Sequence, residues 1–117
     1  MSNELKKSRL PIFTTEEVTG FKITHNLGLV KGNTIRARNV GVDILAIFKT
    51  IVGGEIDEYT KMMAGSREQA LDRMSDDAKN LGADAIIGVR FSTSMIMQGT
   101  AEILAFGTAI RWKKIEQ

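Results

Sequence analysis

The sequence predicts an α+β fold in which a small antiparallel sheet is wrapped on one long helix. Residues 57–81 carry apolar side chains at intervals of three and four, which is typical of an amphipathic helix. Residues 21–31 and 82–110 instead alternate apolar and polar side chains, as strands with two unlike faces do. The predicted order is therefore strand, helix, strand, strand, and the last two strands form a hairpin.

The returning strand of this hairpin has two unlike faces. The turn is predicted at Gln98 and Gly99, because glycine tolerates the positive φ of short connections. Small residues dominate one face, which indicates that the helix packs closely there; this face carries Ala101, Ile103, Ala105, Gly107 and Ala109. We expect a neighbouring subunit to cover the other face, which carries Leu104, Phe106, Ile110 and Trp112.

The segments before the long helix are shorter. Residues 21–31 form the predicted first strand, Gly32 and Asn33 predict a turn, and residues 34–39 form a short extension. Asp43 is placed to cap an apolar helix over residues 43–52, which the following glycine pair ends.

Composition limits the classes of function. The 117 residues suit one domain, predicted over residues 13–117 after a flexible N-terminal arm of residues 1–12. A net charge of +2 is too small to predict a nucleic-acid surface, and no apolar run approaches the roughly 18 residues of a membrane span. The absence of cysteine excludes thiolate metal sites and cysteine nucleophiles, and favours the reducing cytoplasm.

Several short motifs, taken in their order and spacing, resemble the YbjQ-like family of small bacterial proteins of uncharacterised function. The motifs are Asn39 with Asp43, the residues 52–54, the helix 59–81, and the glycine-containing segments 82–85, 88–89 and 107–109. The resemblance implies a dodecin-like fold, a ring-shaped homo-oligomer of five subunits, and a role in binding heavy metals.

The residues themselves give little support to a metal site. Soft and borderline metals favour thiolate and imidazole ligands, and the chain offers only His25. Met95 and Met97 are interpreted as core-filling residues rather than copper ligands. Related proteins often have acidic residues where this chain has Arg90 and Ser92. We therefore expect no cofactor, and the alternative is a divalent metal ion bound by ligands from several subunits.

Two further groups are candidate ligand-binding residues. Arg36 and Arg38 point the same way from an extended chain near Asn39, so they suit an anion, although Glu55, Asp57 or an acidic residue of a neighbouring subunit is an alternative partner for them.

The second group is Glu102 with Arg90. Glu102 stands in a predicted strand, where burial would shift its pKa or where it would form an ion pair with Arg90 across the hairpin. No catalytic fingerprint is present, so the sequence predicts a protein that is not an enzyme.

Overall fold

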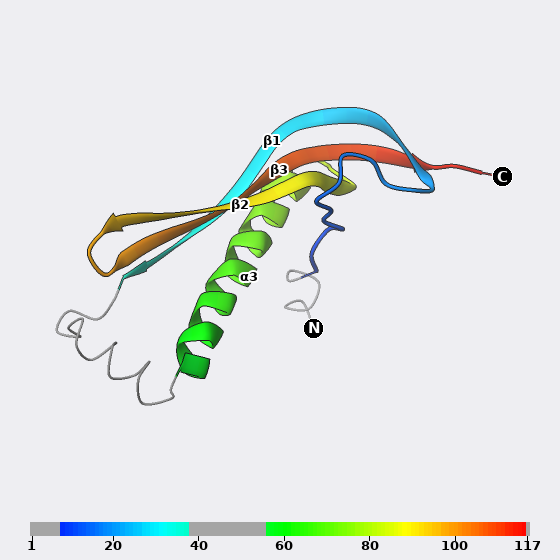
Figure 1. Cartoon of the computed structure of the whole chain (residues 1–117). Coiled ribbons are helices and arrows are strands. Elements are labelled where there is room, and N and C mark those ends of the chain that lie inside the picture. The colour runs from blue at the N-terminus through cyan, green and yellow to red at the C-terminus, as the bar shows by residue number, and fades with distance from the viewer. Residues whose placement is uncertain (1–7, 38–55, 117) are drawn as a thin grey trace.

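The computed structural model describes residues 8–37 and 56–116 and confirms the α+β fold. Its elements are β1 (Phe21–Ala37), α3 (Ile56–Asn80), β2 (Ala85–Met97) and β3 (Thr100–Lys114). The strands form one antiparallel sheet in the order β1-β3-β2, and α3 lies against one side of it (Figure 1). The hairpin prediction is confirmed, and Gly99 has a φ of 79° at its turn.

β1 is one continuous strand, so the turn predicted at Gly32 and Asn33 is wrong. Gly32 is instead the point where the strand backbone meets the helix backbone. A Cβ at this position would lie 2.3 Å from both the carbonyl oxygen of Ala70 and the amide nitrogen of Met74. The glycine is therefore required by close packing of α3, because any side chain would push the helix away from the sheet.

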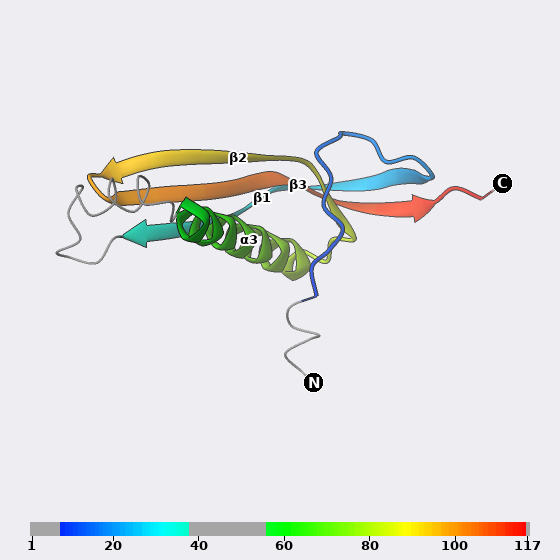
Figure 2. The same cartoon turned by 60° about the horizontal axis from the view of Figure 1, so that its bottom comes forward.

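The small-residue face of β3 packs against α3, as the sequence predicted. Ala105 and Ala109 are fully buried in the main core, together with Ala70, Met74 and Ala78 of the helix. Figure 2 shows α3 crossing this face of the long strands obliquely. The helix therefore covers only part of the sheet, and the hairpin tip extends beyond it.

The chain's own N-terminal segment covers the other face at one end of the sheet. Ile110 is fully buried in a second cluster, against which Phe13, Val18 and Trp112 pack. Trp112 also stacks on Phe21, with ring centroids 3.9 Å apart. The expectation that a neighbouring subunit covers Ile110 is therefore wrong, because residues 13–18 fold back over it, whereas Trp112 is only half-buried by the chain itself.

The residues just before this cover are anchored to the helix. The Arg9 guanidinium bonds the Asp72 carboxylate at 2.8 Å and the Glu68 carboxylate at 3.1 Å. Burial favours the neutral form of Arg9, but these two carboxylates more than offset it and raise its pKa. The Leu10 amide donates to the buried Ser75 hydroxyl at 2.9 Å. The predicted flexibility of the arm stays a prediction for residues 1–7, which lie outside the described residues.

α3 is a single uninterrupted helix of 25 residues, followed by Gly82 in a left-handed conformation. In the described part of the chain, no helix is apolar and long enough to cross a membrane. The short helix predicted for residues 43–52 falls outside the described residues.

Replacement of Gly32 by alanine tests the close approach of α3 to β1. We expect Gly32→Ala to lower the free energy of unfolding by about 3 kcal/mol, at the upper end for overpacked cores, because the clash is with backbone atoms. Urea denaturation at fixed chain concentration measures this change.

The matched control is Gly65→Ala in α3, where a Cβ would meet nothing within 4 Å. This substitution should raise the free energy of unfolding by up to about 1 kcal/mol, because alanine is the better helix former. Equal stabilities of the two variants would contradict the packing argument.

Candidate functional site

The sheet face opposite α3 is uncovered over the half of the sheet nearest the hairpin turn, and we call it the open face. The strand register places Leu29, Lys31, Asn33 and Ile35 of β1 opposite Thr108, Phe106, Leu104 and Glu102 of β3. Leu29 is 67% exposed and Ile35 is 55% exposed. Neighbours at alternate positions, such as Gly32 and Thr34, contact the helix instead. The open face is therefore a partly apolar surface without cover from the described chain.

A hollow of about 590 Å³ lies at the β1 side of the open face and reaches α3, and we call it the side hollow. Its walls carry charges of both signs, from Lys31, Arg73, Asp76, Asp77 and Glu102. The Asn33 side-chain amide donates to Glu102 at 3.1 Å, and Arg73 donates to the Asn33 carbonyl oxygen at 2.7 Å. This arrangement suits a small polar ligand better than a simple anion or cation.

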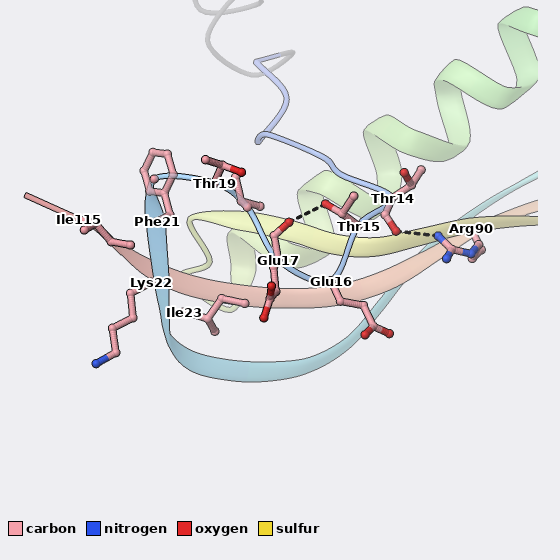
Figure 3. Close-up of a pocket in the computed structure, with 12 residues that line it drawn as sticks. Thr14, Thr15, Glu16, Glu17, Thr19, Phe21, Lys22, Ile23, Arg90 and Ile115 are labelled. Carbon is pink, nitrogen blue, oxygen red and sulfur yellow. Dashed lines mark hydrogen bonds between the residues drawn. The ribbon is translucent and has the colours of Figure 1, made fainter.

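A second, wider hollow of about 1080 Å³ lies under the loop of residues 14–20, and we call it the loop hollow. Arg90 lies at one end, and Phe21 and Ile115 lie at the other (Figure 3). Arg90 donates to the carbonyl oxygen of Thr14 at 2.9 Å and to that of Val89 at 2.8 Å. Its guanidinium therefore holds the loop against β2.

The structure separates the residues that the sequence grouped as ligand candidates. Arg90 lines the loop hollow, whereas Glu102 lines the side hollow. In the hairpin register Arg90 faces Phe106 and Glu102 faces Ser94, so the predicted Arg90–Glu102 ion pair is wrong. Glu102 binds the Asn33 amide instead, an interaction that sequence spacing could not reveal because β1 lies far away in the chain.

Arg36 has a structural role. Its Nε donates to the Ser66 hydroxyl at 2.6 Å, and its Nη2 donates to the Gln69 side-chain oxygen at 2.9 Å. The guanidinium therefore ties β1 to the middle of α3. The other members of that predicted anion site, Arg38, Asn39 and Glu55, lie outside the described residues.

The described residues do not assemble a metal centre around His25. The His25 side chain is exposed, and its Nδ1 lies 2.9 Å from the Thr24 hydroxyl. Its partner in the register is the cationic Arg111, which disfavours a metal ion at this position. Among the described residues, no group of three or more His, Asp or Glu side chains is placed to hold a metal ion.

The exposed methionines correct another sequence interpretation. Met95 is 74% exposed and Met97 is 63% exposed, so neither fills the core of the described chain. A β-bulge separates them, since their partners on β3 are the consecutive residues Ala101 and Thr100. Consecutive strand residues point to opposite faces, so the two thioethers do not converge.

Comparison with known proteins identifies the family. Residues 10–113 match a family described as "Putative heavy-metal-binding". A UPF0145 protein of Dehalococcoides mccartyi is 60% identical over 82% of this chain and 92% of its own length.

A UPF0145 protein of Methanococcus vannielii is 54% identical over 86% of this chain and 96% of its own, so archaeal relatives exist beside bacterial ones. A crystal structure from Pediococcus pentosaceus, of a protein of unknown function in the DUF74 family, shares the fold with a TM-score of 0.61 at 19% identity. It covers 89% of this chain and 98% of its own.

Substitution of Arg36 distinguishes a structural role from a ligand-binding role. We expect Arg36→Met to lower the free energy of unfolding by about 1 kcal/mol, because the charged hydrogen bonds to Ser66 and Gln69 are lost. The control is Lys22→Met, which removes an exposed charge from the start of the same strand. Chemical denaturation measures both, and an unchanged stability of Arg36→Met would contradict the assigned role.

Proposed function

This chain belongs to the YbjQ-like family, and we propose that it is a non-catalytic cytoplasmic protein that forms a ring of identical subunits and binds a small polar ligand where they meet. A ring of five is the assembly that the family resemblance implies. The observation that carries the proposal is the open face, where Leu29 and Ile35 are more than half exposed.

Association through the open face follows from the hydrophobic effect. Leu29 lies diagonal to Phe106 and Ile35 lies diagonal to Leu104, with Lys31 and Asn33 between the two β1 residues, so the open face carries apolar side chains on both strands among polar ones. Burial of these apolar side chains removes surface from water at about 25 cal/mol per Å². α3 already occupies the opposite face, so a second chain is the simplest cover for this one.

The side hollow supports ligand binding at the same contact. Lys31, Asn33 and Glu102 belong both to the open face and to the wall of this hollow. A subunit seated on the open face would therefore close the hollow over a bound molecule. Its charged walls favour a polar ligand with both a donor-rich and an acceptor-rich end.

The arrangement of charged residues supports a binding role rather than catalysis. Catalysis needs convergent reactive groups, whereas Arg36, Arg90 and Glu102 lie in three separate places and each contacts a structural partner. A cysteine-free chain also suits the reducing cytoplasm.

Replacement of Leu29 by lysine tests assembly through the open face. We expect the wild-type chain to form oligomers at micromolar concentration in native mass spectrometry, and Leu29→Lys to shift it to smaller species, because lysine cannot be buried unpaired. Asn26→Lys, an exposed polar position on the same strand, is the control and should keep the wild-type mass. A monomeric wild-type chain at this concentration would overturn the proposal.

The ligand is sought in the wild-type oligomer after denaturation. Mass spectrometry of the released small molecules should detect a compound that is depleted in Glu102→Gln and in Leu29→Lys, since the first alters the hollow and the second opens it. Retention of the compound by both variants would exclude the side hollow as its site.

The family description favours heavy-metal binding as the second candidate. The sequence has a single imidazole, on His25. A metal site would therefore combine the His25 side chains of several subunits around a shared axis. We expect calorimetric titration with Zn²⁺ to give the same heats for wild type and His25→Ala, because Arg111 lies opposite His25. Loss of a measurable affinity in His25→Ala alone would favour the metal-binding function instead.

A further inference from the structure

The end of the sheet where β1 begins and β3 ends carries basic residues directly opposite each other. The strand register pairs Lys22 with Lys113, and His25 with Arg111. Arg111 and Lys113 are two positions apart on β3, so all four side chains share one face, which we call the basic face. All four are exposed. Like charges at opposed positions destabilise a strand pair, so the packing of the sheet gives no reason for this arrangement.

A β-bulge aims His25 at the basic face. β1 shifts by one residue against β3 between Ile23 and His25, and Thr24 is the extra residue. Without this shift Thr24 would stand opposite Arg111, and His25 would point to the other face. The Thr24 hydroxyl instead lies 2.9 Å from His25 Nδ1 and donates to the Arg111 carbonyl oxygen at 3.2 Å. Bulges are common next to sites where a side chain is re-aimed.

The charge of Arg111 is not paired with a carboxylate of the described chain. Among the described residues, both ion pairs within 4.0 Å join Arg9 to α3. The Arg111 Nε donates to the Gly82 carbonyl oxygen at 3.0 Å, so the guanidinium lies just past the end of α3, where β1 and β3 extend beyond the helix (Figure 2). Asp84, which lies beside this part of β3, accepts a hydrogen bond from the Trp112 amide at 3.0 Å.

Lys22 is directed away from the acidic residues of the nearby loop. Figure 3 shows its side chain pointing away from Glu16 and Glu17, which extend from the loop of residues 14–20. Lys113 stands opposite Lys22 and has no carboxylate within 4.0 Å in the described part of the chain. The basic face therefore has a local excess of positive charge, although the net charge of the chain is only +2.

The aromatic residues at this end of the sheet belong to the other face. Phe21 stacks on Trp112 with ring centroids 3.9 Å apart, and Trp112 packs against the cluster that contains Ile110. Proteins that hold single-stranded nucleic acid combine cations with aromatic side chains on which the bases stack. Because these rings lie on the opposite side from the cations, the arrangement favours a compact anion over a nucleic acid.

The basic face is also small. Arg111 and Lys113 are separated by roughly 7 Å at the rise of a strand, and opposed side chains start about 5 Å apart across the ladder. Three cations and an imidazole therefore surround a space that suits one or a few phosphate groups. Arginine binds phosphate through two N–H donors, and lysine acts as a point charge.

We propose that the basic face binds a compact phosphate-bearing ligand with several negative charges, such as a triphosphate chain. Lys22, Arg111 and Lys113 supply the positive charge. The protonated form of His25 adds a donor at Nε2, because its Nδ1 faces the Thr24 hydroxyl. Bound phosphate offsets the repulsion between the opposed lysines. The site shares no residue with the open face or the side hollow, so it is independent of the proposed function.

Calorimetric titration with inorganic triphosphate at about 0.15 M salt tests the site. We expect Lys113→Gln to weaken binding about tenfold, because a cation in direct contact with the phosphates is lost. The matched control is Lys114→Gln, which removes the same charge from the next residue, opposite Phe21 on the other face. Its affinity should stay within about twofold of wild type, because salt screens charges beyond about 8 Å.

Equal losses of affinity in these two variants would overturn the proposal, because they would reflect net charge alone. The absence of heat from the wild-type chain at millimolar triphosphate would overturn it as well.

Reversal of one charge separates binding from folding. Lys113→Glu places opposite charges across the ladder from Lys22, so its free energy of unfolding in urea should equal or exceed the wild-type value while triphosphate binding is lost. Added triphosphate should raise the melting temperature of the wild-type chain and leave that of Lys113→Glu unchanged. Lower stability of Lys113→Glu would contradict the repulsion argument, and wild-type affinity in this variant would refute the site.

Two further probes identify the source of the phosphate. Equal affinities for ATP and triphosphate would support recognition of the phosphate chain alone, and tighter binding of ATP would support a nucleotide as the ligand. A single-stranded DNA of about 20 thymidines is the other probe. If this DNA binds more tightly than triphosphate, with equal losses in Lys113→Gln and Lys114→Gln, the proposal is overturned in favour of a nucleic-acid surface.

Discussion

The contact between the backbone of Gly32 and the backbone of α3 determines which side chains of the sheet are buried under the helix and which are left exposed. The helix approaches β1 so closely that no Cβ fits at Gly32, and the small residues of β3 continue the same shallow face. A helix seated this deeply needs few large side chains to form the core, which consists mostly of alanine, valine and isoleucine. Several large apolar residues are therefore left for the opposite face and the hairpin tip, and among them Leu29, Ile35 and Met95 are more than half exposed.

The N-terminal segment decides which of these apolar surfaces stays inside the subunit. It is anchored at Arg9 to α3, pairs with β2 as far as Val89, and then turns over Ile110 and Trp112. One short segment thus serves as edge strand and as cover for the second cluster. Its reach is limited to about ten residues, so the outer hairpin and the open face remain exposed. In the proposed assembly, this length would determine which apolar surfaces are left for contacts between subunits.

Much of the fold was predictable from the sequence because it rests on local periodicity. The alternation of residues 85–110 and the three-to-four spacing of α3 predicted the hairpin, the helix and the small-residue face. Gly32 was misassigned because a glycine required by close approach of a helix looks the same in sequence as a glycine in a turn. Burial of Ile110 and exposure of Met95 could not be predicted, because both depend on where a distant N-terminal segment lies.

The candidate site was less predictable than the fold for a related reason. Charged residues were grouped by sequence type, yet their roles depend on pairings between strands that are remote in the chain. Arg36 ties β1 to α3, and Arg90 holds the N-terminal loop against β2. Glu102 contacts Asn33 across the sheet.

Of Arg36, Arg90 and Glu102, only Glu102 borders both the side hollow and the open face. A ligand at that position would be enclosed by assembly rather than by the single chain. Affinity for the ligand and association of subunits would then be thermodynamically linked, each strengthening the other. In the proposed assembly, the surfaces that the single chain leaves open would therefore become the binding sites.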